Sequence, residues 1–360
     1  MTENTERYGQ ERYGREGYSQ ETYGQEEYDG GAAPRALPVR TVEVTGVTRI
    51  SPRMVRVTFG GSSLSDFTLD GPDQQVKLYF PRPGQTAPRL PAVGTDGDVM
   101  RWYGAFQAIP ERERPWMRSY SVRAHDPGRG TIDIDFVLHG DGPPGPDGDA
   151  RRDRESGAET GVGAKAEARA RAGAEAGAWA GPATRWAWSA APGAVLGMFG
   201  PSAHFAVPVP LGTADWMLLA GDETALPAIG TLVEALPRGA RAVVYAEVRD
   251  AAEEQRFETA GDVTVHWLHR GQAPAGHGPL VAAVRSAVFP AGSVVAWLAG
   301  EAGVVRALRR HLVGERGLDR RSVLFTGYWR VALTQDDAPT EADLAEARER
   351  LADARAAAGG

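Results

Sequence analysis

An arginine, an aromatic residue and a hydroxyl lie close together at Arg118, Tyr120 and Ser121, in the run RSYSVR. Arginine can neutralise a pyrophosphate, an aromatic ring can cover a planar ligand, and a serine hydroxyl can bond a ring nitrogen. Along a strand, Arg118 and Tyr120 share one face and Ser121 lies on the other, so all three meet one ligand only if the strand twists. Alone, the run also fits an ordinary edge strand with an exposed arginine.

A second group of residues is divided between two places in the chain. His139 and Gly140 end the run DFVLHG, whereas Ala183 and Thr184 lie in the later run GPATRWA. Small residues followed by a hydroxyl allow backbone N–H groups to approach a phosphate closely. The group could therefore cradle a phosphate, with a structural histidine at a strand end as the alternative for His139.

Two acidic residues lie where a buried strand is expected to end and a helix to begin, at Asp222 and Glu223, followed by Thr224. Free N–H groups and the helix dipole favour anions at such a place. Because the two carboxylates oppose a phosphate, a nicotinamide ring or a ribose is the better ligand for this turn. The alternative is a capped turn with no ligand.

Two aromatic residues and an arginine follow one another at Tyr328, Trp329 and Arg330, at the end of the last expected strand. They could face a planar cofactor, or they could be core packing beside a surface arginine. The chain has two lysines, and Lys77 is the one in a segment that is expected to fold.

The elements that must position these motifs fall into two groups. The first group is rich in β-branched residues, with short runs separated by Gly and Pro, which indicates a small antiparallel barrel. Its expected strands cover residues 39–50, 53–60, 74–80, 119–124, 131–139 and 194–200.

From about residue 212 strands alternate with helices, which indicates a doubly wound parallel sheet. Continuous apolar runs are typical of its buried strands, and ligands of such sheets bind at the carboxyl ends of the strands. Thr224 is the expected N-cap of the first helix. The expected strands cover residues 215–221, 241–248, 263–268, 293–300 and 322–329, and the expected helices cover residues 224–236, 279–288 and 304–315.

We therefore expect two domains and three further segments. Tyrosine at every fifth position and missing aliphatic residues predict a disordered N-terminal tail, and a low-complexity stretch without a hydrophobic stripe predicts an insertion into a surface loop. The expected parts are the tail at 1–36, the barrel at 37–140 and 181–211, the insertion at 141–180, the α/β domain at 212–335, and an amphipathic C-terminal helix at 336–360.

Composition limits the chemistry that is available. Because the chain has no cysteine, it has no disulfide, thiol nucleophile or Cys-ligated cluster, and redox chemistry would need an organic cofactor or another protein. A net charge of -7 gives no nucleic-acid footprint, and no apolar run is long enough for a membrane span. The first residues lack the apolar core of a secretory signal, so we expect a cytoplasmic protein without membrane insertion.

In their order along the chain, the runs RSYSVR, DFVLHG, GPATRWA, GDETALPAI and GYWR resemble those of siderophore-interacting proteins. These are FAD-dependent ferric-siderophore reductases related to ferredoxin–NADP reductases. The resemblance covers about residues 38–140 and 181–331. It implies an FAD-binding barrel, an NAD(P)H-binding α/β domain, and reduction of ferric siderophores with release of Fe(II).

The resemblance also implies roles for the residues that match the family motifs. Arg118 resembles the pyrophosphate partner of FAD, Tyr120 the residue stacked on the flavin ring, and Ser121 the partner of flavin N5. The other expected cofactor residues are His139, Gly140, Ala183 and Thr184 at the FAD phosphates, Asp222, Glu223 and Thr224 beside the nicotinamide nucleotide, and Trp329 at a planar cofactor; Lys77, Arg123 and Arg330 are expected to hold an anionic ferric chelate.

Three departures from the family pattern are visible. The segment 141–180 divides the phosphate-binding motif, so the loop must close again around it. Ala332 stands where the family usually has glycine, and Gln75 stands where a histidine is common.

No general base is needed for electron transfer, because the flavin carries the chemistry. Reduction of Fe(III) weakens its chelation by hard oxygen ligands. Glu247 could accept a ribose hydroxyl of NADH, Arg249 could meet the extra phosphate of NADPH, and the helix expected at 339–358 makes ferredoxin a third candidate donor. The alternatives are a flavin-dependent reductase of a quinone or free flavin, and a non-enzymatic siderophore-binding or scaffold protein.

Overall fold

The computed structural model describes residues 39–92, 98–139, 181–201 and 209–331, together with residues 333, 340, 341 and 345. The expected tail, the expected insertion and most of the expected C-terminal helix lie outside the described residues, as do Gly140 and Ala332. Within the described part, no helix is long and apolar enough to cross a membrane.

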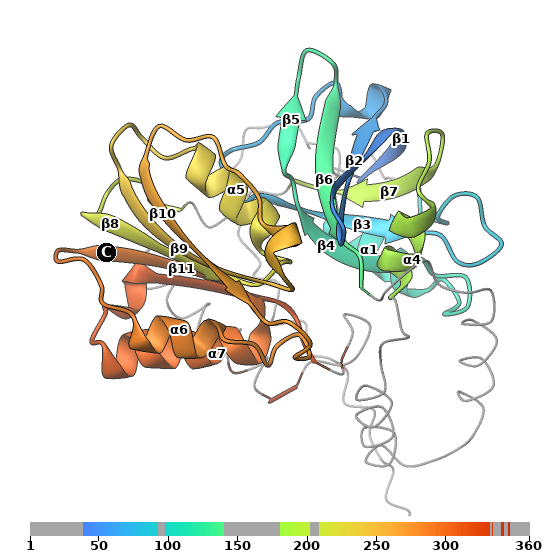
Figure 1. The fold of residues 1–360 in the computed structure, drawn as a ribbon. Helices are drawn as coiled ribbons and strands as arrows, with labels where there is room; N and C mark the ends of the chain where they lie inside the picture. The colour runs from blue at the N-terminus through green and yellow to red at the C-terminus, as the bar shows by residue number, and fades with distance from the viewer. Residues whose placement is uncertain are drawn as a thin grey trace, which may run out of the picture.

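Seven strands form an antiparallel, barrel-like sheet in the first half of the chain (Figure 1). Their order is β4-β3-β7-β1-β2-β6-β5, so β4 lies at one edge of the sheet. The strands are β1 (Val39–Ser51), β2 (Met54–Gly60), β3 (Gln75–Phe80), β4 (Trp116–Ser121), β5 (Ala124–Asp126), β6 (Thr131–Val137) and β7 (Val195–Phe199).

Strand alternation builds the core of this sheet. Along β6, Ile134 and Phe136 are buried in the core, whereas Asp135 faces β2 and receives two hydrogen bonds from the Arg56 guanidinium, at 2.7 and 2.9 Å. Apolar residues on one face and a cross-strand ion pair on the other explain why this segment forms a strand.

Two helices that the sequence analysis did not predict pack on the barrel, α1 (Val99–Gln107) and α4 (Pro182–Ser189). Helix α1 buries Trp102 and Phe106 against Tyr79 of β3. Helix α4 begins with a proline, which suits the first turn because that position has no N–H partner inside the helix.

Five parallel strands form the second sheet, in the order β10-β9-β8-β11-β12. Figure 1 shows helices α6 and α7 on one face and α5 on the other, as expected of a doubly wound sheet. The elements are β8 (Trp216–Gly221), α5 (Leu226–Glu234), β9 (Arg241–Val248), β10 (Asp262–His269), α6 (Leu280–Ser286), β11 (Val294–Glu301), α7 (Ala302–Arg310) and β12 (Val323–Trp329), with short helical turns η2 (Ser62–Leu64), η4 (Ala251–Glu253), η5 (His311–Glu315) and η6 (Arg320–Ser322).

Strand β8 explains the apolar run that the sequence shows. Met217 and Leu219 pack in the core beneath α5, whereas Trp216 and Leu218 pack in the core beneath α6 and α7. A strand that is buried on both faces needs apolar residues at every position.

The strand order places the ligand crevice of the second sheet. The chain leaves β8 toward β9 on one side and returns to β11 on the other, so the order reverses between β8 and β11. Ligands of such sheets bind at the carboxyl ends of the strands where the order reverses. Gly221 and Asp222 at the end of β8, and Gly300 and Glu301 at the end of β11, therefore lie at this crevice.

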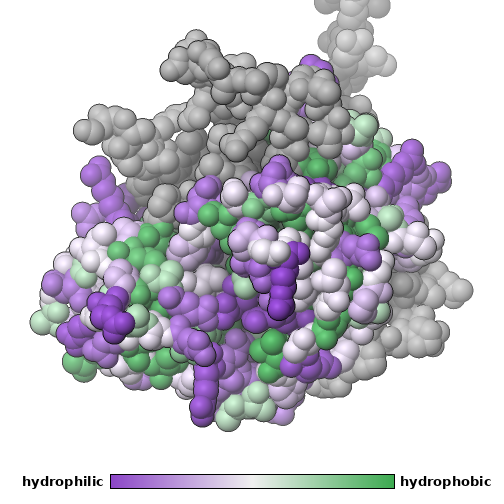
Figure 2. All heavy atoms as spheres, turned by 90° about the horizontal axis from the view of Figure 1, so that it is seen from above, coloured by the Kyte–Doolittle hydropathy of each residue, from purple (hydrophilic) through white to green (hydrophobic). Residues whose placement is uncertain are grey.

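Hydrophobic and hydrophilic residues are mixed on the face of the molecule that Figure 2 draws. Figure 2 shows that, where grey atoms do not cover this face, hydrophobic residues lie in small areas among hydrophilic ones. The candidate functional residues lie instead at the junction between the two sheets.

Candidate functional site

The run RSYS lies on β4, at the edge of the barrel sheet. Tyr120 packs its ring on Phe136, with 4.5 Å between the ring centroids, and burial raises its pKa, so it stays a neutral phenol. The Arg118 guanidinium donates a hydrogen bond to the Met117 carbonyl at 2.7 Å. Because β4 is an edge strand, a planar ligand along its outer edge can meet side chains from both faces, which removes the difficulty that Ser121 alternates with Tyr120.

Ser121 meets the second domain at the junction of the two sheets. Its hydroxyl oxygen lies 3.5 Å from the hydroxyl oxygen of Tyr328, which belongs to the run GYWR on β12. Tyr328 donates a hydrogen bond to Asp73 at 2.9 Å, and the Trp297 indole N–H donates to the same carboxylate at 2.8 Å. Two motifs from different domains therefore meet at one buried polar cluster.

The structure brings the two halves of the divided phosphate motif together. The Thr184 hydroxyl donates to the carbonyl of Val137, at the end of β6, with 3.4 Å between the oxygens. The sequence predicts a loop at Ala183 and Thr184, but both lie in the first turn of α4, because Trp186 and Ala187 further along the helix pack on the barrel core. The described parts of the two runs, at Val137 and Thr184, therefore lie next to each other.

His139 follows β6 and faces charged residues of both domains. Loss of solvation lowers the pKa of His139, and the negative charge of Asp222 opposes this effect. The positive charges of Arg270 and Arg53 lower the pKa further. The ring therefore stays neutral to a lower pH than an ordinary histidine does. The phosphate end of the barrel and the acidic turn after β8 consequently face each other.

Asp222 fastens the ends of three strands together. Its carboxylate accepts hydrogen bonds from the backbone N–H of Thr224 at 2.9 Å and of Glu301 at 2.8 Å, and from the Trp329 indole at 2.8 Å. Burial, followed by the nearby charge of Glu223, raises the pKa of Asp222. Both carboxylate oxygens have protein donors, so Asp222 positions Trp329, and its direct contact with a nucleotide stays a prediction.

The neighbours of Asp222 are also held by the protein. Glu223 forms a bidentate ion pair with Arg270, with both N–O distances 2.6 Å. The Thr224 hydroxyl donates to Asp222, and helix α5 begins after Ala225 without a side-chain cap. The expectation that Thr224 caps the helix is therefore wrong, because its hydroxyl is used by the adjacent carboxylate.

The two residues that could choose between NADH and NADPH lie at the carboxyl end of β9, Glu247 within the strand and Arg249 just after it. Glu247 is buried and accepts a hydrogen bond from the Leu280 N–H at 3.1 Å, at the start of α6. Burial raises its pKa, and that hydrogen bond opposes the rise. Arg249 donates to the Gln272 side chain at 3.5 Å. The choice between NADH and NADPH stays a prediction. One oxygen of the Glu247 carboxylate is already bonded to the N–H of Leu280 at the start of α6.

Lys77 and Arg330 lie near the meeting point of Ser121 and Tyr328 along their own strands. Lys77 is two residues along β3 from Gln75, which pairs with Ser121 in register and hydrogen bonds to Tyr328, so it lies about 7 Å along the same face. Burial lowers the pKa of Lys77. Arg330 is two residues beyond Tyr328.

Arg123 lies elsewhere in the structure than its predicted role requires. It forms a bidentate ion pair with Glu234 of α5, with N–O distances of 2.8 and 2.5 Å, and its side chain is only 12% exposed. This pair joins the barrel to the α/β domain. The guanidinium of Arg123 is therefore used by the contact between the domains and does not hold a substrate.

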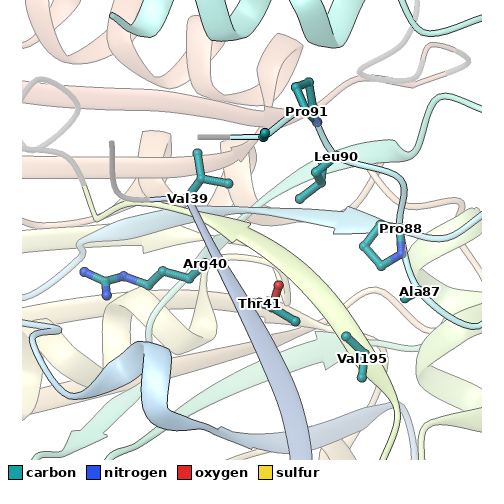
Figure 3. A pocket seen from close by; sticks show the side chains of 9 residues that line it. Val39, Arg40, Thr41, Ala87, Pro88, Leu90, Pro91 and Val195 are labelled. Carbon is teal, nitrogen blue, oxygen red and sulfur yellow. The ribbon is translucent and has the colours of Figure 1, made fainter. Parts of the chain in front are cut away.

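A cavity of about 340 Å³ lies on the barrel between β1 and residues 87–92 (Figure 3). Val39, Leu90, Pro91 and Val195 line it, and Figure 3 shows the Arg40 side chain extending away from them. None of the predicted site residues lines this cavity, so it is separate from the junction described above.

The described residues fit FAD and a nicotinamide nucleotide by their chemistry. The first turn of α4 has no side-chain cap at Gly181, which leaves helix N–H groups for a phosphate, and Arg118 adds a guanidinium. At the second sheet, a Cβ atom on Gly221 would lie 2.6 Å from the Ala299 carbonyl, so glycine is needed for the close approach of β8 and β11 at the crevice.

Comparisons with known proteins agree with this geometry. The model of the siderophore-interacting FAD-binding domain matches residues 43–205, and that of the siderophore-interacting protein matches residues 214–332. The ferric vibriobactin reductase of Vibrio cholerae is 29% identical over 78% of this chain and 85% of its own length. The NADPH-dependent ferric-chelate reductase of Escherichia coli is 28% identical over 81% of this chain and 92% of its own.

A solved structure extends the likeness to the whole fold. The crystal structure of a siderophore utilization protein from T. fusca is 35% identical, covers 84% of this chain and 97% of its own, and superposes with a TM-score of 0.64. A barrel with an FAD-binding domain model, followed by a parallel α/β domain, defines a two-domain flavoprotein. The chain belongs to the siderophore-interacting protein family, and the predictions of that family, of the fold class and of FAD as cofactor are confirmed.

Several residues of the junction were not identified from the sequence. Gly300 and Glu301 follow an apolar strand, so the rule that ligands bind at strand ends could have identified them. Asp73, Trp297 and Arg270 carry no local signal, because their importance comes from partners far away in the chain.

Proposed function

We propose that this protein is an FAD-dependent ferric-siderophore reductase that takes a hydride from NAD(P)H and passes electrons to chelated Fe(III). The observation that carries this proposal is the meeting of Ser121 on β4 with Tyr328 on β12. The run that resembles the flavin-ring motif and the end of the nucleotide-type sheet converge there. A hydride donor and its acceptor need this convergence, because the reacting atoms must come within contact distance.

The chain's own residues divide the binding of FAD between two places. Arg118 and the first turn of α4, with Ala183 and Thr184, hold the phosphates. Tyr120 covers the ring and Ser121 bonds its N5 atom. When bound, FAD supplies two-electron acceptance and one-electron delivery, chemistry that no side chain of this protein provides.

The second domain orients the hydride donor. Asp222 holds Trp329 at the ends of β8 and β12, and the paired Glu223 and Arg270 close the turn beside it. These contacts fix the wall of the crevice. The proposal has two further parts, a cytoplasmic location and ferredoxin as an alternative electron donor. Both are supported by the sequence alone.

Lys77 and Arg330 supply positive charge for an anionic ferric chelate. Burial lowers the pKa of Lys77, so a bound anion would restore the preference of its amine for the proton. Electrostatic attraction of this kind raises the association rate and weakens as salt is added. No proton transfer to the chelate is required, since reduction to Fe(II) itself weakens binding by hard oxygen ligands.

The test is an anaerobic absorbance experiment on the full chain. We expect flavin bands that bleach with NADPH or NADH and recover when a ferric hydroxamate is added, with Fe(II) captured by a colourless indicator. Recovery with a quinone or free flavin but with no ferric chelate would contradict the proposal and favour another acceptor. Protein that remains colourless after incubation with FAD would favour a binding protein instead.

Two variants separate the substrate site from general charge. Lys77→Ala and Arg330→Ala should raise the KM for an anionic chelate and leave the rate of bleaching by the donor unchanged. Arg129→Ala is the matched control, because its side chain is 84% exposed on the β5–β6 turn. An equal effect of all three substitutions would exclude a specific role for Lys77 and Arg330. Bleaching by reduced ferredoxin but by neither nucleotide would identify ferredoxin as the donor.

A further inference from the structure

The proposed reaction leaves one proton at the flavin ring. Oxidation of one NAD(P)H by two chelated ferric ions yields NAD(P)⁺, two Fe(II) and one proton. The hydride carries two electrons and one proton to N5, and each Fe(III) takes one electron. The proton stays on the ring until something removes it, so the protein must provide an acceptor or admit water.

A line of polar groups begins at the residue expected to bond N5. The hydroxyl oxygen of Ser121 lies 3.5 Å from that of Tyr328, and the Tyr328 hydroxyl donates to the Asp73 carboxylate at 2.9 Å. Trp297 donates to the other oxygen of the same carboxylate at 2.8 Å. The line passes from the barrel to the α/β domain and returns to the barrel.

We propose that Asp73 receives the proton released at the flavin ring, through the hydroxyl groups of Ser121 and Tyr328. The inference rests on the proposed function, since that function places the ring beside Ser121. The proton acceptor lies outside the runs that carry the family resemblance, because Asp73 belongs to none of them.

The groups around Asp73 suit this role. The groups facing the carboxylate are the neutral Trp297 of β11, Tyr328 of β12 and Ser121 of β4, while the Asp73 backbone N–H donates to Thr231 of α5 at 3.1 Å. Burial raises the pKa of Asp73 to about 6, and the three side-chain hydrogen bonds oppose the rise. Above that pH the carboxylate can accept a proton, and it can release the proton again without a large cost.

Tyr328 serves as a neutral bridge. Burial, with the charge of Asp73, raises its pKa well above the ordinary value, so the phenol keeps its proton except during transfer. Asp73 lies in a turn at a φ of 61°, a left-handed conformation that Asp adopts more readily than most residues. The turn is tied to α5 by the bond to Thr231, which holds the carboxylate toward Tyr328.

The transfer balances in atoms and charge. The Ser121 oxygen would accept the proton that the ring releases from N5 when the second electron passes to Fe(III). The Ser121 proton goes to the Tyr328 oxygen, and the Tyr328 proton goes to the Asp73 carboxylate, where an O–H bond forms. Asp73 is partly exposed, so it returns its proton to water and the hydroxyl groups reset.

The first test measures reoxidation of the reduced holoenzyme from pH 5 to 9. Ferricyanide serves as acceptor because it takes one electron and needs no siderophore site. In the wild type the rate should rise with a midpoint near pH 6. Asp73→Asn and Tyr328→Phe should be about tenfold slower above pH 7 and lose this profile, less than the ~10²-fold that a positioned base can supply, because water also reaches Asp73.

Glu253→Gln is the matched control. Glu253 is also a buried carboxylate at the junction, where it accepts hydrogen bonds from the Ser51 hydroxyl and, at 3.2 Å, from the Arg53 N–H. It should keep the wild-type profile if the effect belongs to the relay. A wild-type rate and profile in Asp73→Asn would overturn the proposal, as would an equal slowing in Glu253→Gln. The same result in Tyr328→Phe would overturn the bridge through Tyr328, since Ser121 also faces the Asp73 carboxylate.

The second test uses the apoprotein and needs no activity. With ¹³C-labelled aspartate carboxyl groups, one resonance should titrate near pH 6, vanish in Asp73→Asn, and titrate at higher pH in Tyr328→Phe because the carboxylate loses a donor. No such resonance would overturn the relay. Enzyme reoxidised by ferricyanide but by no ferric chelate would instead refute the proposed function alone, and a chain that binds no FAD would refute both.

Discussion

Replacing Asp73 by Asn should change how the stability of the protein depends on pH. Burial raises the pKa of this carboxyl from 3.8 to about 6 in the folded protein. A difference of roughly 2 units corresponds to about 3 kcal/mol, since each unit is worth about 1.4 kcal/mol. Asn has nearly the same shape but cannot ionise, so it removes this dependence.

The direction follows from proton binding. Because the folded pKa lies above the unfolded value, the folded protein binds more protons than the unfolded chain between pH 3.8 and about 6. The contribution of the protonated Asp73 carboxyl to stability is therefore complete below pH 3.8 and is lost as the pH rises toward 6. Above pH 7 the wild type carries the full cost of a buried carboxylate.

The assay is urea unfolding of the apoprotein at several pH values from 3.5 to 7.5. The free energy of unfolding of Asp73→Asn minus that of the wild type should increase by about 3 kcal/mol over this range. At the lowest pH, this difference in the free energy of unfolding reports only the altered hydrogen bonds to Trp297 and Tyr328. In Tyr328→Phe, the free energy of unfolding should depend more steeply on pH than in the wild type, because the Asp73 carboxylate loses one hydrogen-bond donor. Parallel curves for Asp73→Asn and the wild type would refute the reasoning.

Three further predictions concern the crevice, the junction and the cofactor. Gly300→Ala should destabilise the protein by about 2 kcal/mol or more and weaken nucleotide binding, since its φ is 132° and a Cβ atom would lie 2.6 Å from an Asp222 carboxylate oxygen. A double-mutant cycle on Arg123 and Glu234, measured by urea unfolding, should give a coupling of about 1–2 kcal/mol, because the pair is bidentate and partly buried. Arg118→Ala should weaken FAD binding by about ten- to a hundredfold, measured by flavin fluorescence titration.

Each of these has a control and a contrary outcome. Gly314→Ala should leave stability nearly unchanged, since a Cβ atom there meets nothing within 4 Å, and an equal loss in both glycine variants would contradict the argument from contact. A coupling energy near zero would show that Arg123 does not join the domains. Arg129→Ala should bind FAD normally, and an equal weakening by Arg129→Ala and Arg118→Ala would reduce the effect to net charge.

The sequence predicted the elements well where a local pattern decides them. The strand expected at 241–248 is β9 with the same bounds, and the strand expected at 215–221 is β8 to within one residue. The helix expected at 304–315 divides into α7 and the wider turn η5. Helices α1 and α4 were not predicted, because each is short and is stabilised by aromatic residues packed on the barrel.

The candidate site was predicted in part. Ser121 on β4 and Tyr328 at the end of β12 meet at the junction, as a cofactor site between two domains requires. Arg123 does not serve there, because Glu234 of another domain takes its guanidinium. Ala183 and Thr184 lie in a helix, and the closing of their motif depends on a hydrogen bond to Val137 that no local pattern encodes.

The sequence by itself determined most of the strands and the helices of the second sheet, the order of the two domains, and the runs that resemble one family. These depend on residue types at fixed short spacings, which periodicity and turn chemistry translate directly into structure. The tertiary structure alone decided that Asp73 meets Trp297, 224 positions away, and Tyr328, 255 positions away. Contacts at such separation form only when both sheets have buried their faces and docked, so the acceptor that we propose for the proton is a product of the assembled junction.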